Sequence, residues 1–239
     1  MVNKFYVSGE QRAQRVNDLF AAIAPRYDLI NDFQSFGLHR WWKCRLIQLG
    51  QIKPGECALD VCCGTGDLAL ALARAGALVT GVDFSAPMLA VAEQRRQAGG
   101  STGLNFVLGD AQNLPVPDNL FEIVTMGYGL RNLADLELGL AEMRRVAKPN
   151  GRILVLDFGK PDHALWRALY FGYLKWFVPI LGRLLCGDAQ THGYILESLQ
   201  RYPGQQAVAE KMRALGLLNV QVINLLGGIM SINYGEKPA

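Results

Sequence analysis

Two adjacent cysteines and a glycine turn stand between two acids in the stretch DVCCGTGD, residues 60–67. These residue types could bind a metal, form a redox pair, cradle a phosphate or hold another ligand. The five cysteines form no C-x-x-C pair and the chain has only three histidines, so we expect no metal site. Neighbours on a strand point to opposite faces, which favours small buried apolar side chains over a shared role for the two cysteines.

The acids beside the glycine turn argue against a phosphate ligand. The turn lacks the GK[ST] ending of a phosphate-binding loop and the third glycine of a dinucleotide-binding loop. Asp67 follows Gly66 directly, and a carboxylate there would repel phosphate and favour a cationic or amine-bearing ligand.

Two further acids end the next two predicted strands, Asp83 in GVDFS and Asp110 in LGDAQ. Ligands of open α/β sheets bind beyond the carboxyl ends of the strands, where an acid placed like Asp83 holds the two ribose hydroxyls. Asp110 lies where a side chain can reach an adenine amino group. Each acid alone could equally be a solvated loop residue or a helix cap. Together with the turn, they predict a site for a nucleoside without phosphates and with a positive tail, a description that fits S-adenosylmethionine.

The elements that must position these residues alternate between strand and helix from residue 56 onward. This alternation predicts βαβ units and a mostly parallel, twisted sheet with helices on both faces. An antiparallel strand pair joined near Gly227 and Gly228 is expected at the sheet edge. Ser85 is placed to cap the second helix. The predicted parallel strands are 57–62, 77–84, 104–110, 121–129 and 152–158, and the helices between them are 66–76, 86–99 and 134–151.

Composition limits the class of protein. The 239 residues are 50% hydrophobic and 19% charged, with a formal charge of +3, which suits one α/β domain with a sizeable core. The small charge and the lack of a basic run disfavour nucleic acid as a partner. The N-terminus has no apolar h-region and the cysteines have no framework spacing, so we expect a cytoplasmic protein. No apolar stretch reaches the roughly 18–20 residues that span a bilayer.

One domain, 1–239, is predicted in four parts. They are an N-terminal helical cap (1–50), a cofactor-binding core (51–160), an apolar helical insertion or lid (161–202), and a final helix with edge strands (203–239). The insertion contains ALWRALYFGYLKWFVPILGRLLC, residues 164–186, which is strongly apolar and aromatic and carries spaced basic residues. Such a segment can be buried core, a lid over an apolar pocket, or an interfacial helix at a membrane surface.

Motifs along nearly the whole chain resemble those of a known family. They include VNDLFAAIAPRYDLINDFQSFGLHRWWK, LDVCCGTGDLA, GVDFSAPML, GDAQNLPVPDNLFEIVTMGYGLRNL and MRRVAKPNGRILVLDFGKP. The chain resembles the seven-stranded, class I adenosylmethionine-dependent methyltransferases of Rossmann-like fold. Within them it is similar to the ubiquinone/menaquinone biosynthesis C-methyltransferases, and CCGTGD with TMGYGLRN is most similar to cyanobacterial and plant members that act on demethylphylloquinol.

The resemblance implies S-adenosyl-L-methionine as cofactor and S-adenosyl-L-homocysteine as product. Family contacts to the cofactor fall on Thr65, Asp83, Asp110 and Ala111. A serine contact of some members falls on Gly127, where only a backbone contact could remain. The expected cofactor-binding residues are Asp60, Gly64, Thr65, Gly66, Asp83, Phe84, Asp110, Ala111 and Gly127.

The motif GYGLRN, at the end of the fourth predicted strand, would face the reactive end of the cofactor. A quinol ring carbon becomes nucleophilic as a ring hydroxyl loses its proton, and Arg131 could stabilise the developing phenolate. Arg131 could instead form a structural salt bridge. The proton acceptor is a water held by Arg131, or His39, although His39 more readily serves as a packing residue. The expected catalytic residues are Arg131, Asn132, Tyr128 and His39.

The resemblance also implies a partner. A prenylated quinol needs an apolar channel and resides in a membrane, so we expect peripheral contact with the bilayer through residues 164–186. Tyr194, in THGYILESLQRYP, is a weaker candidate for substrate contact. The sequence does not decide whether the chain forms a homodimer.

Other classes of protein remain as alternatives. Demethylmenaquinol or a ubiquinone precursor could replace demethylphylloquinol as substrate. An RNA or small-amine methyltransferase, a non-catalytic adenosylmethionine-fold binding or assembly protein, and a nicotinamide dehydrogenase are rival functions. Asp67 and the missing third glycine count against the dehydrogenase.

Overall fold

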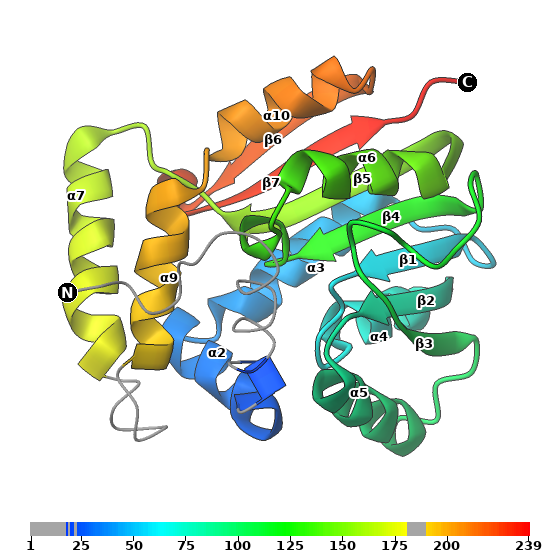
Figure 1. Ribbon diagram of the computed structural model, residues 1–239, viewed down its shortest axis with the longest axis horizontal. Coiled ribbons are helices and arrows are strands. Elements are labelled where there is room, and N and C mark those ends of the chain that lie inside the picture. The colour runs from blue at the N-terminus through cyan, green and yellow to red at the C-terminus, as the bar shows by residue number, and fades with distance from the viewer. Residues whose placement is uncertain (1–17, 19, 22, 181–189) are drawn as a thin grey trace.

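A seven-stranded sheet runs through the molecule in the order β3-β2-β1-β4-β5-β7-β6 (Figure 1). The computed structural model describes residues 18, 20, 21, 23–180 and 190–239, and the side chains of Pro25 and of residues 190–195 lie outside this description. Strands β1 to β5 pair in parallel, and β7 pairs antiparallel with β5 and β6. The strands are β1 (Cys57–Val61), β2 (Leu78–Asp83), β3 (Leu104–Leu108), β4 (Phe121–Gly127), β5 (Ala147–Phe158), β6 (Leu218–Leu225) and β7 (Met230–Glu236). The strand order reverses between β1 and β4, which puts the ligand-binding crevice beyond their carboxyl ends.

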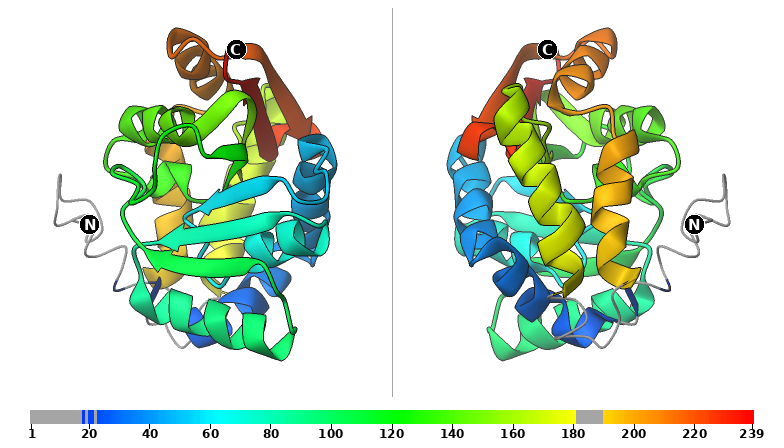
Figure 2. Two further views of the ribbon diagram at one scale, coloured as in Figure 1. Left: turned by 90° about the vertical axis from the view of Figure 1, so that its right-hand side faces the viewer. Right: turned by 90° about the vertical axis from the view of Figure 1, so that its left-hand side faces the viewer.

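Alternate residues of the central strands enter two separate cores. Ala58 and Ile123 cluster with residues of α3 and α4, whereas Leu59 and Val124 cluster with residues of α6 and α10. Figure 2 shows the sheet between these helical layers. Because both faces are covered, the central strands are apolar along nearly their whole length. The layer helices are α3 (Leu38–Gly50), α4 (Asp67–Arg74), α5 (Ala86–Ala98), α6 (Leu136–Val146) and α10 (Gln205–Ala214).

Helices from distant parts of the chain gather beyond the carboxyl ends of the parallel strands. In the right-hand view of Figure 2, α7 lies between α9 and the α2–α3 pair. The hydroxyl of Tyr173 donates to the backbone carbonyl of Gln34 at 2.8 Å and so joins the two sides. These elements are α2 (Tyr27–Ser35), α7 (Ala164–Gly172), a π-helical turn (Tyr173–Phe177), α9 (Gln190–Arg201) and the short 3-10 turns Ala24–Arg26, Leu130–Asn132 and Leu226–Gly228.

The fold class predicted from the sequence is confirmed, including the antiparallel pair β6–β7 that turns at Gly227 and Gly228. The third helix ends earlier than predicted, at Val146, and β5 begins at once with Ala147. The KPNG stretch therefore lies in a strand, where the β4–β5 register is irregular and Asn150 has a φ of 61°.

Helix capping differs from the prediction at one position. Ser85 occupies the N-cap of α5, but its side chain makes no capping hydrogen bond. Asp135, by contrast, caps α6 by accepting from the backbone amides of Glu137 and Leu138.

The predicted insertion 161–202 contains α7, the π-helical turn and α9. Its middle, including Cys186, lies outside the described residues. Within the part of the chain that the structure covers, no helix has the length and apolar character needed to cross a membrane. The four-part division of the domain stays a prediction.

Candidate active site

The glycine turn after β1 is joined to Asp83 at the end of β2. The backbone amide of Gly64 donates to one carboxylate oxygen of Asp83 at 2.8 Å, and that of Ser85 donates to the other at 2.9 Å. Gly64 has a φ of 56°, a backbone conformation that glycine adopts without strain. Burial raises the pKa of Asp83, and the two amides oppose this effect. The carboxylate is therefore fixed at the strand end, facing the crevice.

A cavity of about 160 Å³ lies beside this turn, and we call it the glycine-turn cavity. Asp110 lies in its wall, where its carboxylate accepts from the backbone amide of Gln112 at 2.9 Å and is held in one orientation. The structure thus brings most of the expected cofactor residues together. Those that line the cavity are Gly64, Asp83, Phe84, Asp110, Ala111 and Gly127, and two expected catalytic residues, Tyr128 and Asn132, line it as well.

Three expected cofactor residues do not line this cavity. Asp60 is buried, accepts from the Thr125 hydroxyl at 3.0 Å, and has its pKa raised to about 7 by burial. The hydroxyl of Thr65 donates to Asp28 of α2 at 3.1 Å instead of facing the cavity. Gly66 packs so closely that an added Cβ would lie 2.8 Å from the aromatic ring of a β3 residue. These three residues therefore support the turn through contacts on the side away from the cavity.

Asp67 anchors the N-terminal helices to the turn. Its carboxylate accepts from Lys43 of α3 at 2.5 Å and from Arg95 of α5 at 3.3 Å, and Arg95 also pairs with Asp28 at 2.6 Å. Burial works to raise the pKa of Asp67, but the neighbouring cations, Lys43 foremost and Arg95 with it, together outweigh burial and the pKa is lowered. The expectation that Asp67 attracts a cationic ligand is corrected, because two cations of the chain already balance its charge.

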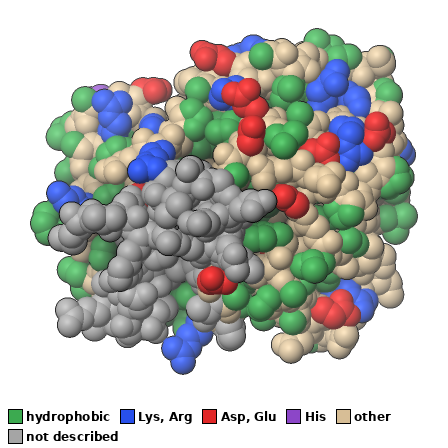
Figure 3. Space-filling view, in the orientation of Figure 1, with side chains coloured by type: hydrophobic (Ala, Val, Ile, Leu, Met, Phe, Trp, Pro, Cys, Tyr) green, Lys and Arg blue, Asp and Glu red, His purple; other side chains and the backbone are tan. Residues whose placement is uncertain are grey.

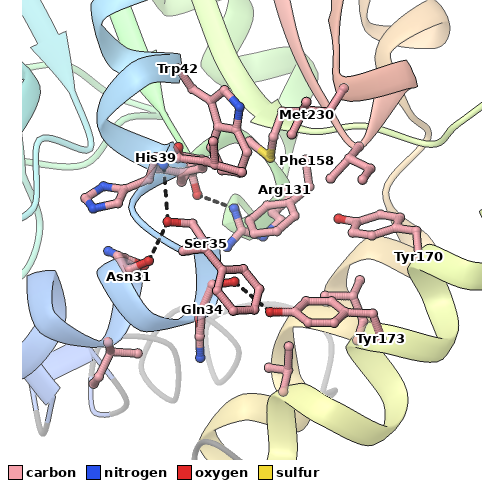
Figure 4. A pocket seen from close by; sticks show the side chains of 18 of the residues that line it. Asn31, Gln34, Ser35, His39, Trp42, Arg131, Phe158, Tyr170, Tyr173 and Met230 are labelled. Carbon is pink, nitrogen blue, oxygen red and sulfur yellow. Dashed lines mark hydrogen bonds between the residues drawn. The ribbon is translucent and has the colours of Figure 1, made fainter.

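A larger cavity, of about 360 Å³, adjoins the first (Figure 4). Phe20, Tyr27 and Tyr128 line both cavities. In Figure 4 the side chains of Tyr170 and Tyr173 come from one side, and that of Trp42 comes from the opposite side. We call this space the aromatic cavity. Its aromatic and aliphatic lining includes Phe36, Trp42, Phe158, Trp166, Leu169, Tyr170, Tyr173, Ile229 and Met230.

Tyr128 forms part of the wall between the two cavities. It follows β4 with a φ of 63°, an uncommon conformation for a bulky residue and one associated with functional sites. Its ring lies 5.9 Å from that of Phe158, centroid to centroid. Within the described structure its buried hydroxyl has no hydrogen-bond partner. Burial raises the pKa of Tyr128 well above its ordinary value, so the hydroxyl keeps its proton.

Arg131 lines the aromatic cavity and is also part of a buried ion pair. Its guanidinium donates to Asp157 at 2.8 Å and to the carbonyl of Tyr128 at 2.7 Å, and its backbone amide donates to Asp157 at 3.1 Å. The guanidinium carbon lies 4.5 Å from the Phe158 ring centroid. Arg131 therefore forms the structural salt bridge and also lies at the cavity, while its role beside a phenolate stays a prediction. Asn132 donates to the Tyr128 carbonyl at 3.3 Å.

His39 belongs to a second charged group, on α2 and α3. Its Nε2 lies 2.8 Å from Asp32, whose carboxylate also forms a bidentate ion pair with Arg40. In Figure 4 its imidazole points away from Arg131 and the centre of the aromatic cavity. Burial lowers the pKa of His39, and the Asp32 hydrogen bond opposes this. His39 nevertheless lines the aromatic cavity, and its Nδ1 has no partner within the described structure, so its role as proton acceptor stays a prediction.

The two adjacent cysteines are separated in their surroundings. Cys63 is buried, whereas Cys62 lines the glycine-turn cavity with a φ of 56°. Burial raises the pKa of both thiols well above the ordinary value, so both stay protonated. The backbone of Gly129 approaches so closely that a Cβ there would lie 2.6 Å from the Cβ of Cys62. Among the residues that the structure describes, no cluster of side chains could hold a metal ion.

The comparison with protein-family models matches residues 7–237 to the ubiE/COQ5 methyltransferase family. The chain belongs to this family. A ubiquinone/menaquinone biosynthesis C-methyltransferase of Cellvibrio japonicus is 40% identical over 233 residues, covering 96% of this chain and 94% of the relative. A demethylmenaquinone methyltransferase of Desulfitobacterium hafniense is 40% identical over 237 residues, covering 97% and 93%.

A solved structure supports the fold independently. Phosphoethanolamine N-methyltransferase 2 of Haemonchus contortus, in complex with S-adenosylmethionine, has a TM-score of 0.63 at 16% identity, covering 82% of this chain and 52% of that one. At this identity the likeness shows the fold alone. With the ubiE/COQ5 membership, it identifies the chain as a class I adenosylmethionine-dependent methyltransferase, as the sequence resemblance implies.

The residues of the glycine-turn cavity fit S-adenosylmethionine. Two oriented carboxylates, Asp83 and Asp110, suit hydroxyl and amino donors and would repel phosphate. Ser85 also lines the cavity, and its buried hydroxyl has no partner among the residues described. When bound, the cofactor supplies an electrophilic methyl group on a sulfonium. The chain would place that end near Gly127 and Tyr128, where the two cavities meet.

Several lining residues were missed by the sequence reasoning. Phe20 and Tyr27 line both cavities, and only their place inside a family motif could have pointed to them. Met88, in the first turn of α5, lines the glycine-turn cavity, and helical spacing alone does not distinguish such a residue from a core residue. Asp157 lines neither cavity but pairs with Arg131; it is the penultimate residue of β5, and that position near a strand end was the signal that could have found it. Tyr194 and His192 lie among the side chains outside the description.

The Arg131–Asp157 pair yields a test that separates its two roles. Arg131→Gln leaves the Asp157 carboxylate buried without its cation, so we expect the free energy of unfolding to fall by about 3–5 kcal/mol. Arg131→Gln combined with Asp157→Asn removes both charges and should recover most of that loss, because no uncompensated charge remains. Urea unfolding measures the stability and methyl transfer measures the activity. A stable double variant with full turnover would show that Arg131 has only a structural role.

Proposed function

We propose that the protein methylates a ring carbon of a reduced, prenylated quinone precursor, with demethylphylloquinol as the first substrate and demethylmenaquinol as the alternative. The observation that carries the proposal is the aromatic cavity, which shares Tyr128 with the glycine-turn cavity and could hold a flat ring and an apolar tail beside the cofactor. The names of both relatives, which concern ubiquinone or menaquinone, support the class of substrate.

The cavity residues would act mainly by positioning. Aromatic walls orient a ring at the boundary with the cofactor, and orientation alone can lower a barrier by several kcal/mol. The Tyr128 hydroxyl, buried and protonated, would donate to the ring oxygen next to the reacting carbon. Arg131 would favour the phenolate form of that oxygen, although the charge of Asp157 weakens its field. The proton would leave through a water at Arg131, since His39 points elsewhere.

The cofactor is proposed to bind through Asp83 to its ribose and through Asp110 to its adenine. Asp110→Ala removes the carboxylate from the cavity, so we expect the affinity for S-adenosylhomocysteine to fall about tenfold. Asp110→Asn keeps an acceptor for the Gln112 amide and should lose less. Calorimetric titration gives both dissociation constants. Unchanged affinity in Asp110→Ala would remove Asp110 from the cofactor site.

The substrate proposal is tested with labelled S-adenosylmethionine under reducing conditions. We expect label in demethylphylloquinol or demethylmenaquinol in preference to a prenylated benzoquinol, and none in the oxidised quinones, because only the reduced ring has a nucleophilic carbon. Cofactor binding without label in any of the three quinols would instead favour a non-catalytic binding or assembly protein.

Peripheral contact with a membrane is also proposed, at the mouth of the aromatic cavity. By the mouth we mean the rim between the end of α2 and the π-helical turn. Both sides of it expose an aromatic side chain: Phe36, after α2, is 70% exposed, and Trp176, in the π-helical turn, is 68% exposed. Phe36 and Phe177 stack across the mouth, 6.3 Å between centroids. Lys175 lies over the ring of Trp176, and Figure 3 shows hydrophobic side chains interspersed with basic ones at the edge formed by α7. Aromatic and basic residues together suit an anionic lipid surface.

Flotation with vesicles of anionic phospholipid tests this contact. We expect Phe36→Ser combined with Trp176→Ser to weaken binding at least about tenfold, because it removes two large apolar groups from the contact. Leu78→Ser combined with Leu120→Ser alters exposed leucines at the other end of the sheet and should change little. Equal effects of the two pairs, or no binding by the unaltered protein, would refute the contact.

A further inference from the structure

Buried polar atoms without partners gather at the aromatic cavity. Within the described structure, Asn31 Nδ2, His39 Nδ1, Trp42 Nε1 and the hydroxyls of Tyr128 and Tyr170 have no hydrogen-bond partner, and all five residues line this cavity. Most buried polar groups in proteins are hydrogen-bonded. A concentration of unpaired groups in one apolar space therefore indicates a ligand with polar atoms of its own.

Tyr170 is the most enclosed of the tyrosines that line the cavity. It lies near the end of α7 and is 5% exposed. Figure 4 shows its ring entering the cavity with the hydroxyl directed toward Phe158 and Arg131. Burial raises the pKa of Tyr170, so the hydroxyl stays protonated and can donate a hydrogen bond.

We propose that the hydroxyl of Tyr170 binds the ring oxygen of the quinol that lies farther from the cofactor, and that Tyr170 is therefore a substrate-positioning residue. The inference rests on the proposed function. A para-quinol carries two oxygens on opposite sides of its ring. Tyr128 lines both cavities and is placed for the nearer oxygen, whereas Tyr170 lines only the aromatic cavity. Two donors at opposite ends of the ring fix the position and direction of the axis through its two oxygens, and the aromatic walls restrict rotation about that axis.

This arrangement predicts selection of a diol over a single hydroxyl. A ligand that lacks the far oxygen would leave the Tyr170 hydroxyl buried and unpaired, which a site built to bind that oxygen disfavours. Tyr170 would thus distinguish a quinol from a prenylated naphthol of the same shape.

Tyr202 provides a matched control. It is 3% exposed, its hydroxyl also lacks a partner within the described structure, and it lies in the field of the same Arg131–Asp157 pair. It does not line the aromatic cavity. Tyr202→Phe therefore removes an equally buried hydroxyl that has no access to the substrate.

The experiment measures anaerobic binding to protein saturated with S-adenosylhomocysteine, which prevents turnover. The two ligands are demethylmenaquinol with a short prenyl tail and the matching naphthol without the far hydroxyl. We expect the unaltered protein and Tyr202→Phe to prefer the quinol about tenfold, and Tyr170→Phe to bind both ligands equally. Thermal unfolding should be nearly unchanged in both variants, since phenylalanine keeps the ring.

Three results would overturn the inference: no preference in the unaltered protein, a preference retained in Tyr170→Phe, or a preference lost equally in Tyr202→Phe. Failure of the unaltered protein to bind either ligand would instead refute the proposed function, and the inference with it.

Discussion

The buried ion pair between Arg131 and Asp157 fixes the point at which the two cavities meet. Asp157 is the penultimate residue of β5, and Arg131 lies in the turn after β4, so the pair joins the ends of two neighbouring strands. Two charges inside a protein are stable only when further hydrogen bonds satisfy them. Here the backbone amides of Arg131 and Phe158 bind the carboxylate, and the Tyr128 carbonyl binds the guanidinium. The backbone of Tyr128 is thereby held in its left-handed conformation between cofactor and substrate.

The aromatic cavity depends on segments that are far apart in the chain. One wall comes from α2 and α3 and the other from α7 and the π-helical turn, and Tyr173 and Gln34, which join them, are separated by 139 residues. Ion pairs attach the first wall to the glycine turn. Lys43 of α3 pairs with Asp67 after the turn, and Asp28 of α2 pairs with Arg95, which also binds Asp67. Movement of the N-terminal helices would therefore alter both cavities together, which suits a reaction in which ring and cofactor must be aligned.

The local pattern of apolar and polar residues was sufficient to predict the sheet, the glycine turn and the acids at the strand ends. The central strands are apolar and bounded by glycines and acids, so their number, their order along the chain and the acids at their ends could be read directly. The partners of those acids could not. Thr65 turns to Asp28, 37 residues earlier, and Asp67 binds Lys43, 24 residues earlier. A side chain's orientation at a turn is decided by such distant contacts, which no local periodicity encodes, so Thr65 and Asp67 were expected to face the ligand and do not.

The close approach of Gly129 to Cys62 has a consequence for how these loops can change during evolution. Because the Cβ of any residue at position 62 would occupy nearly the same place, position 129 can gain a side chain only if position 62 becomes glycine or one of the loops shifts. Drift at either position is therefore conditional on the other, although they belong to separate motifs. Engineered exchange of one loop between homologues is expected to succeed more often when the other loop is exchanged with it.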